Sequence, residues 1–152
     1  MLTYALFTLL PGSVFMVMHT AWLFLEEEPE LRRRGLLQDL DCLALLLSAL
    51  CHDLEHPGTT NAFQVNTGSA LAIRYNDASV LENHHASVAA GVLSRARVLT
   101  PLRPADVKRV RRSMLTAILA TDSAFPRYGD FGCCLPALNA CAIHSASRSV
   151  DA

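Results

Sequence analysis

Two histidines and an aspartate lie close together in this chain of 152 residues, and their types are those of metal ligands. They belong to the stretch His52–Gly58, which follows an apolar run. If that run is helical, His52 and His56 are one turn apart, Asp53 lies beside them, and Pro57-Gly58 ends the helix. Nitrogen and oxygen atoms crowded at a helix end suit a divalent metal ion that activates water. The alternative is a polar helix end whose side chains simply face solvent.

Two later segments supply more candidate site residues. Ser79 and Glu82 have the spacing of a capping box, which predicts that a helix begins there with Glu82 and His85 on one face. If they belong to the site, Glu82 and His85 orient a metal-bound water or the imidazoles of His52 and His56. The alternative is that Glu82 is only a helix cap and His85 only a surface histidine. Thr121 and Asp122 end a further apolar run and bring one more carboxylate.

Helices are the elements predicted to position these residues, because apolar side chains recur every three or four positions. The long helices are expected to span Ser13–Glu27, Leu36–His56, Ser79–Arg97 and Pro104–Thr121. Two short helices are expected in the loop Pro57–Asp77, near Asn61–Phe63 and Ser69–Arg74. In the second long helix, five leucines form the predicted buried stripe: Leu36, Leu40, Leu43, Leu47 and Leu50. The pattern therefore predicts an all-α fold.

Charged residues mark the expected surface. An acidic and then a basic run, Glu26–Pro29 and Arg32–Gly35, predict a charged hinge between the first two long helices. The last helix has four basic residues, which we expect on a solvated face: Lys108, Arg109, Arg111 and Arg112. Its opposite, apolar face is expected to be buried: Val107, Val110, Met114, Leu115 and Ile118.

Three segments together resemble the catalytic domain of class I 3′,5′-cyclic nucleotide phosphodiesterases, which are HD-type metal-dependent phosphohydrolases. The segments are HDLEHPGTTNAF, LAIRYNDASVLENHH and ILATD, and the resemblance covers about Val17 to Asp122. It implies a multi-helix bundle, incomplete here at both ends, and two divalent metals, zinc and magnesium (or manganese). It also implies hydrolysis of cAMP or cGMP to the 5′-monophosphate by a hydroxide that the dinuclear centre activates, in cyclic-nucleotide signal transduction.

The same resemblance implies roles for individual residues. His52 resembles a ligand of the tight, zinc-like metal, and Asp53 resembles the carboxylate that both metals share. Three residues resemble the catalytic shell that holds the waters of the second, magnesium-like metal and the bridging hydroxide: His56, Glu82 and His85. Two residues resemble positions near that water network: Thr121 and Asp122.

The chain departs from the family in the segments before and after these motifs. The family has an upstream histidine motif, but Ser13 stands at its ligand position, and His19 points about 240° away on a helix. We therefore expect His19 to be a packed or surface histidine. No clear counterpart follows Asp122 for the family's late aspartate ligand. Two of the usual four first-metal ligands remain, which predicts weak metal binding and poor or no hydrolysis. The partial domain is expected at 13–130, with a foreign segment at 1–12 and a loosely ordered, foreign tail at 131–152.

Composition limits partners and location. A net charge of −1 gives no argument for nucleic acid, and 51% apolar residues suggest a core partly left for missing family helices or a homodimer. Membrane insertion is not expected, since Pro11-Gly12 interrupt the uncharged first 25 residues and no basic region precedes them. Five cysteines without Cys-x-x-Cys spacing are expected to be thiols of a cytoplasmic protein: Cys42, Cys51, Cys133, Cys134 and Cys141.

Three alternatives to the phosphodiesterase fit parts of the same motifs. A zincin-like peptidase helix needs glutamate after His52, where the chain has Asp53. A di-iron bundle needs a second Glu-x-x-His besides Glu82-x-x-His85. The remaining alternative is a catalytically degenerate helical module that binds a partner or dimerises, and the missing ligands favour it for the isolated chain.

Overall fold

The computed structural model describes residues 11–123, with side chains from Val14 onward. These residues form helices and no strand, which confirms the all-α expectation. The helices are α2 (Pro11–Glu27), α3 (Pro29–Arg33), α4 (Asp39–Cys51), α5 (Asn61–Asn66), α6 (Ala70–Arg74), α7 (Val80–Arg95) and α8 (Pro104–Leu119). The expectations for the tail 131–152, for residues 1–10 and for the side chain of Ser13 lie outside this range.

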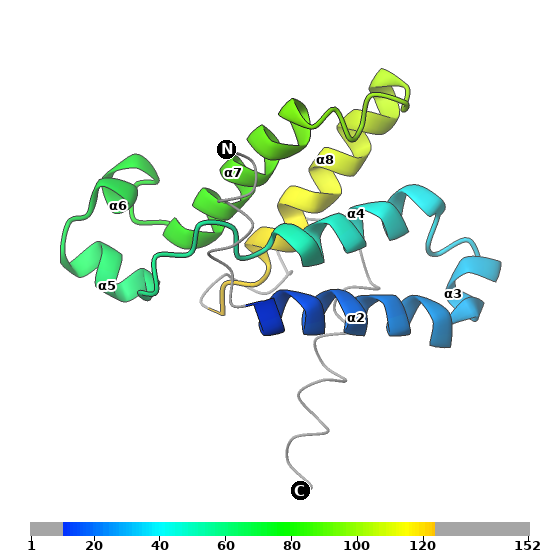
Figure 1. Cartoon of the computed structure of the whole chain (residues 1–152), viewed down its shortest axis with the longest axis horizontal. Helices are drawn as coiled ribbons and strands as arrows, with labels where there is room; N and C mark the ends of the chain where they lie inside the picture. The colour runs from blue at the N-terminus through cyan, green and yellow to red at the C-terminus, as the bar shows by residue number, and fades with distance from the viewer. Residues whose placement is uncertain (1–10, 124–152) are drawn as a thin grey trace, which may run out of the picture.

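Helix α4 lies at the centre of the arrangement (Figure 1). It packs against α2 on one side and against α8 on the other, and α7 lies along α8. The short helices α5 and α6 extend to one side, next to the start of α7 (Figure 1). One apolar cluster joins α4, α7 and α8: Ala44, Leu93, Val110 and Met114. A second lies under the turn after α4: Val14, Cys51, Leu54, Ala89 and Ile118.

Side-chain caps explain where several helices begin. The Thr60 and Ser69 hydroxyls accept the backbone N–H groups of Phe63 (3.2 Å) and Ala72 (3.1 Å), which starts α5 and α6. A capping box formed by Gln38 and Asp41 starts α4.

The capping box expected at Ser79 is wrong, although α7 does begin after that residue. Ser79 has a φ of 41° and its side chain makes no capping hydrogen bond. The Glu82 carboxylate accepts a hydrogen bond from Asn61. The spacing of Ser79 and Glu82 therefore predicted where α7 begins, but not which hydrogen bonds these two side chains make.

The expected helix Leu36–His56 is shorter in the structure. Its start moves to Asp39 because the capping box fixes Gln38 in an extended conformation, and its helical hydrogen bonding ends at Cys51. Of the predicted leucine stripe, Leu36 and Leu50 are exposed, while the smaller Ala44 and Ser48 are buried. Helices cross closely at α4, so small side chains occupy the crowded positions.

Two expectations about charged residues also change. The acidic–basic hinge contains a helix of its own, α3 (Pro29–Arg33). On α8, the basic face is exposed as expected, but Arg109 also binds both oxygens of Asp41 on α4, at 2.8 and 3.0 Å. Of the face expected to be buried, Val110, Met114 and Ile118 are buried, Val107 is half-buried and Leu115 is exposed.

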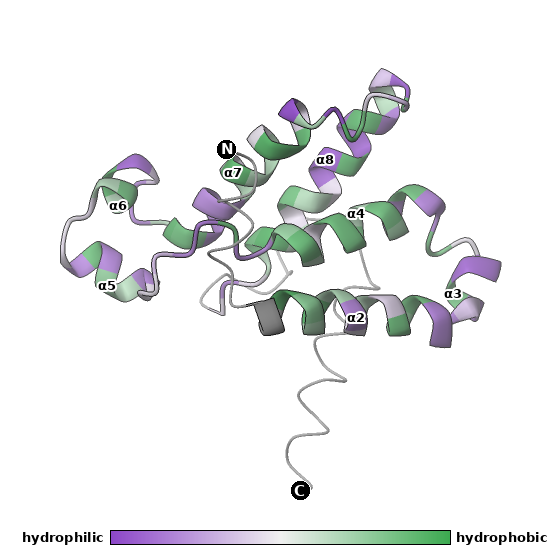
Figure 2. Ribbon diagram, in the orientation of Figure 1, coloured by the Kyte–Doolittle hydropathy of each residue, from purple (hydrophilic) through white to green (hydrophobic). Residues whose placement is uncertain are grey.

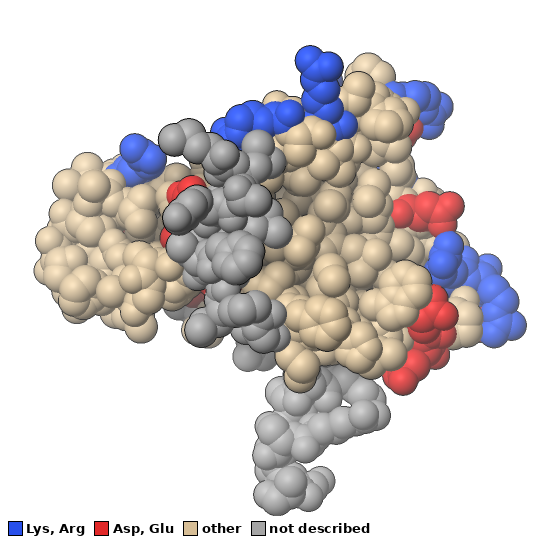
Figure 3. All heavy atoms as spheres, viewed as in Figure 1, with Lys and Arg blue, Asp and Glu red and all other residues tan. Residues whose placement is uncertain are grey.

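Helix α2 presents large apolar side chains to solvent. Figure 2 shows hydrophobic residues along most of its length, and Met16 and Trp22 are 63% and 50% exposed. On the face in Figure 3, charged side chains gather over the end with α3, while the surface over the middle of α2 and α4 is uncharged. Within 11–123, no helix combines the length and apolarity that crossing a bilayer requires.

Candidate metal centre

The turn that follows α4 brings candidate ligands to the start of α7. Leu54 is buried in the apolar cluster below this turn and anchors it. Glu55, between Asp53 and His56 in this turn, has a φ of 56°, in the left-handed region. One ligand atom each from Asp53, His56 and His85 then lie within 4.8 Å of one another. A group of this kind can hold a divalent metal ion.

His85 is the buried member of this group, with 3% of its surface exposed. Its Nδ1 lies 2.6 Å from the carbonyl oxygen of Leu54. Because a carbonyl only accepts, Nδ1 carries the proton and Nε2 keeps its lone pair. That Nε2 lies 3.7 Å from Oδ1 of Asp53, and its lone pair is available to bind a metal ion.

The surroundings of His85 favour its neutral form. Burial lowers its pKa below the usual range, since the charged imidazolium loses its hydration. The Leu54 carbonyl and the Asp53 carboxylate oppose this shift, and the rings of His56 and His84 add to it. A neutral imidazole is the form that binds metal.

His56 has the opposite proton arrangement. The backbone N–H of Gly58 donates to its Nδ1 at 3.0 Å, so in the neutral ring Nε2 carries the proton. The ring stacks on that of His85 with centroids 5.5 Å apart. In this state His56 offers a hydrogen-bond donor to a water or an anion at the centre, and it becomes a ligand only if the Gly58 contact is released.

His52 lies at the end of α4, beside the centre but outside the group of three. Its Nδ1 is 2.9 Å from the carbonyl oxygen of Ala49, which places the proton on Nδ1 and leaves Nε2 free to bind. The expectation that His52 and His56 lie one helical turn apart is wrong, because α4 ends at Cys51 and a non-helical turn carries both.

Asn61 is a site residue that the sequence interpretation missed. Its Nδ2 donates to Oε2 of Glu82 at 2.8 Å, and its Oδ1 accepts the backbone N–H of Leu81 at 2.9 Å. It thus ties α5 to the start of α7 and orients the Glu82 carboxylate. The signal available was its place as the first residue of a helix just after the His52–Gly58 stretch.

Glu82, Thr121 and Asp122 are placed near the ends of helices but are not in the group of three within 11–123. The Thr121 hydroxyl donates to the carbonyl oxygen of Ile118 at 2.7 Å, closing the end of α8. Asp122 follows it and is half-buried. His19 is exposed on α2 and stacks on Phe15 with centroids 6.0 Å apart, so its expected place on the surface is confirmed.

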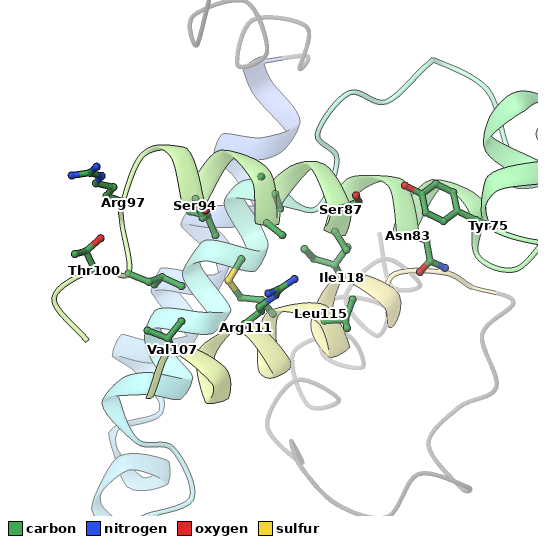
Figure 4. A pocket seen from close by; sticks show the side chains of 17 residues that line it. Tyr75, Asn83, Ser87, Ser94, Arg97, Thr100, Val107, Arg111, Leu115 and Ile118 are labelled. Carbon is green, nitrogen blue, oxygen red and sulfur yellow. The ribbon is translucent and has the colours of Figure 1, made fainter. Parts of the chain in front are cut away.

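A cavity of about 810 Å³ lies between α7 and α8, and His85 is not among the residues that line it. Figure 4 shows Tyr75 and Asn83 at one end, Arg97 and Thr100 at the other, and Leu115 on the α8 wall. None of the residues that approach one another at the candidate metal centre lines it. Its walls combine apolar side chains with polar ones, including Arg97 and Arg111, and the cavity is separate from the group of three.

Comparison with known proteins connects this geometry to a family. The mouse high affinity cGMP-specific 3′,5′-cyclic phosphodiesterase 9A is 45% identical over 87 residues, which are 56% of this chain and 16% of that protein. The human high affinity cAMP-specific and IBMX-insensitive 3′,5′-cyclic phosphodiesterase 8A is 37% identical over 109 residues, or 70% of this chain and 13% of that protein.

A solved structure agrees with these relatives. The phosphodiesterase domain of the RhoPDE fusion protein from the choanoflagellate Salpingoeca rosetta superposes with a TM-score of 0.68 at 41% identity. The match covers 74% of this chain and 35% of that domain. The chain therefore spans a minor part of the relatives that it matches. The family model described as 3′5′-cyclic nucleotide phosphodiesterase matches residues 13–126, and this chain belongs to that family.

Proposed function

We propose that this chain forms the metal-binding part of a catalytic domain that hydrolyses the 3′,5′-cyclic phosphodiester of cAMP or cGMP in signal transduction. The observation that carries the proposal is the approach of Asp53, His56 and His85 to within 4.8 Å in a chain of this family. Relatives named as cGMP-specific and as cAMP-specific both match, so the proposal covers both nucleotides. The partial domain spans 13–130 in this proposal.

Two divalent metals, zinc and magnesium (or manganese), are the proposed cofactors. When bound, such a pair supplies a water of lowered pKa and positive charge for the phosphoryl oxygens. The donor set fits this demand, because imidazole nitrogen suits zinc and carboxylate oxygen suits magnesium. The neutral His85 and the free Nε2 of His52 support the assignment.

The proposed roles follow from the proton positions. His52 offers Nε2 as a ligand to the zinc-like ion, and Asp53 offers a carboxylate to both ions. His56 holds a proton on Nε2 and donates it in a hydrogen bond to the water or the phosphate. His85 accepts at Nε2, and Asn61 holds Glu82 in the orientation to accept from a second water. Thr121 and Asp122 are proposed to border this water network.

A metal titration of the whole chain tests the proposal. We expect up to two divalent ions per chain by equilibrium dialysis, with weak affinity because Ser13 replaces an imidazole ligand. We expect hydrolysis of cAMP and cGMP to be slow or absent in the metal-loaded chain. Failure to bind any divalent ion contradicts the metal centre, and turnover at rates typical of intact family members contradicts the expected weakness.

A second candidate function is a catalytically degenerate module that binds a partner or a second copy of the chain. The exposed apolar residues of α2, among them Met16 and Trp22, favour it. Sedimentation of the purified chain tests it: a concentration-dependent dimer without bound metal supports the module. We further propose a cytoplasmic location, because Cys42 and Cys51 are free thiols.

A further inference from the structure

Two adjacent histidines of α7 contact the turn that carries the candidate metal centre, but only one belongs to the centre. His85 binds the Leu54 carbonyl through Nδ1, as described above. His84 places Nε2 3.3 Å from Oε2 of Glu55. Neighbouring residues on a helix point about 100° apart, so the two contacts hold the turn at two separate points.

The backbone conformation of Glu55 explains why its contact with His84 matters. Its φ of 56° lies in the left-handed region, which glycine occupies without cost and glutamate does not. Three residues later the turn uses Gly58, with a φ of 76°, where no side chain is needed. A side chain kept at a strained position persists only where surrounding contacts fix it. At Glu55 the described contact that does so is the one with His84.

The surroundings of His84 restrict its orientation. Only 14% of its side chain is exposed, against 49% for Glu55. The ring of Tyr75 lies against it with centroids 6.4 Å apart and planes tilted by 57°. The His84 imidazole is therefore the more enclosed partner, and the more exposed Glu55 carboxylate contacts it.

We propose that Glu55 and His84 are positioning residues, which hold the turn so that Asp53 and His56 face His85 without themselves touching the bound ion. This inference rests on the proposed metal centre. Glu55 lies between Asp53 and His56 in the chain, so loss of its contact with His84 frees this part of the turn to move away from α7, and Asp53 and His56 move with it. Residues that orient ligands in this way typically change metal affinity by about 10- to 100-fold.

Asparagine at position 55 separates the side-chain contact from the backbone. Asparagine tolerates a positive φ, and its side chain is too short to reach His84. For Glu55→Asn and for His84→Asn, we expect the dissociation constant for Co²⁺ to rise about tenfold and the visible absorption band of the bound Co²⁺ to change shape. Glu26→Asn, at an exposed glutamate on α2, is the matched control and should leave both unchanged.

The double variant Glu55→Asn/His84→Asn tests whether the two residues act as a pair. We expect it to lose no more affinity than either single variant, because the contact is already broken. Additive losses overturn the pairing, and so does an unchanged dissociation constant and band in both single variants. Urea unfolding of the metal-free proteins, unchanged between variants and control, excludes general destabilisation as the cause.

A second measurement needs no metal and keeps the two proposals distinguishable. The Leu54 N–H donates to the Cys51 carbonyl within the turn at 3.3 Å, and the Leu54 side chain is buried in the cluster that includes Ala89 of α7, so exchange of this N–H reports whether the turn stays closed. We expect about tenfold faster exchange at Leu54 in Glu55→Asn and in His84→Asn than in Glu26→Asn. Unchanged exchange overturns the positioning role. Lack of Co²⁺ binding in the unaltered chain, with the exchange effect present, instead overturns the metal centre alone.

Discussion

Two clusters of charged and polar side chains join helices in this chain, and they differ in how many polar atoms are already paired. Between α4 and α8, Asp41 receives two hydrogen bonds from Arg109 and one from the Gln38 backbone, and Arg109 also donates to the Gln38 side chain. At the candidate metal centre, Asp53 and His85 face each other at 3.7 Å, beyond hydrogen-bond length.

The difference separates a structural cluster from a functional one. Both oxygens of Asp41 already accept hydrogen bonds, three in all, and its side chain is only 10% exposed, so it has little left to offer a ligand. Each histidine of the metal centre uses Nδ1 for a hydrogen bond to the backbone, and Nε2 of His85 lies 3.7 Å from Asp53. A site that binds an ion needs ligand atoms that lie close together and are not all hydrogen-bonded within the protein, since a metal or a water must complete it.

The largest effect that this comparison predicts is on metal binding. Asp53→Asn removes the charge that neutralises the ion, and we expect a loss of at least 100-fold in Co²⁺ affinity, about 2.7 kcal/mol. We expect the free energy of unfolding to change by less than about 0.5 kcal/mol, because the carboxylate is half-exposed and makes no short hydrogen bond. Absorbance titration and urea unfolding measure the two. A large loss of stability with unchanged affinity would make Asp53 a structural residue.

The reverse pattern is expected at the α4–α8 cluster. Arg109→Ala leaves the nearly buried Asp41 carboxylate, with 10% of its side chain exposed, without its guanidinium. We expect a loss of about 2 kcal/mol in the free energy of unfolding, less than for a fully buried pair because Arg109 is itself 42% exposed. Co²⁺ affinity should stay within twofold.

Arg112→Ala is the matched control, since Arg112 is exposed on the same helix. It should change stability by less than about 0.5 kcal/mol. Because alanine is the better helix former, helix propensity cannot explain a loss in either variant, and equal losses would show that the effect at Arg109 does not come from its contact with Asp41.

A smaller effect is the pH dependence of stability that His85 contributes. Burial lowers its pKa in the folded chain, so below pH about 6.5 the unfolded chain binds more protons than the folded one. In EDTA, stability should therefore fall as pH drops from 7 to 5. His85→Gln should flatten this slope, and His19→Gln, at an exposed histidine, should not. A steep slope retained in His85→Gln would place the titrating group elsewhere.

The sequence predicted the positions of most long helices well, but it did not predict where α4 ends. Periodicity located α2, α7 and α8 to within a few residues, because each is long and buries one face. The end of α4 was misplaced because five more residues fit the helical pattern, while the tertiary contact between Leu54 and His85 favours a turn. Only a contact between residues far apart in sequence decides this.

The contents of the site follow the same division. Local spacing identified Asp53, His56 and His85 as candidates, and the structure brings these three together. The proton positions were out of reach, since they depend on backbone groups such as the Gly58 N–H and the Ala49 carbonyl. Asn61 was missed because its partners, Leu81 and Glu82, lie about twenty residues away.

The smallest expected effect concerns the apolar cluster below the metal centre, which contains Cys51 and Leu54. Burial raises the pKa of Cys51 to about 11, so only about one molecule in a thousand carries the thiolate at pH 8. The pKa of the half-buried Cys42 is also raised by burial, but Arg32 opposes that shift. In a chain with Cys133, Cys134 and Cys141 replaced by serine, iodoacetamide should modify Cys42 first.

The order of modification has a direct structural meaning. Cys51 packs in the cluster that holds Leu54, and Leu54 anchors the turn with Asp53 and His56. Modification of Cys51 therefore requires the turn to lift from α7, and bound Co²⁺ should slow it further because the ion favours the closed turn. If Cys51 reacts as fast as Cys42, the apolar cluster below the turn is open to solvent. The metal centre is then not preformed, and its contrast with the hydrogen-bonded Asp41 cluster no longer holds.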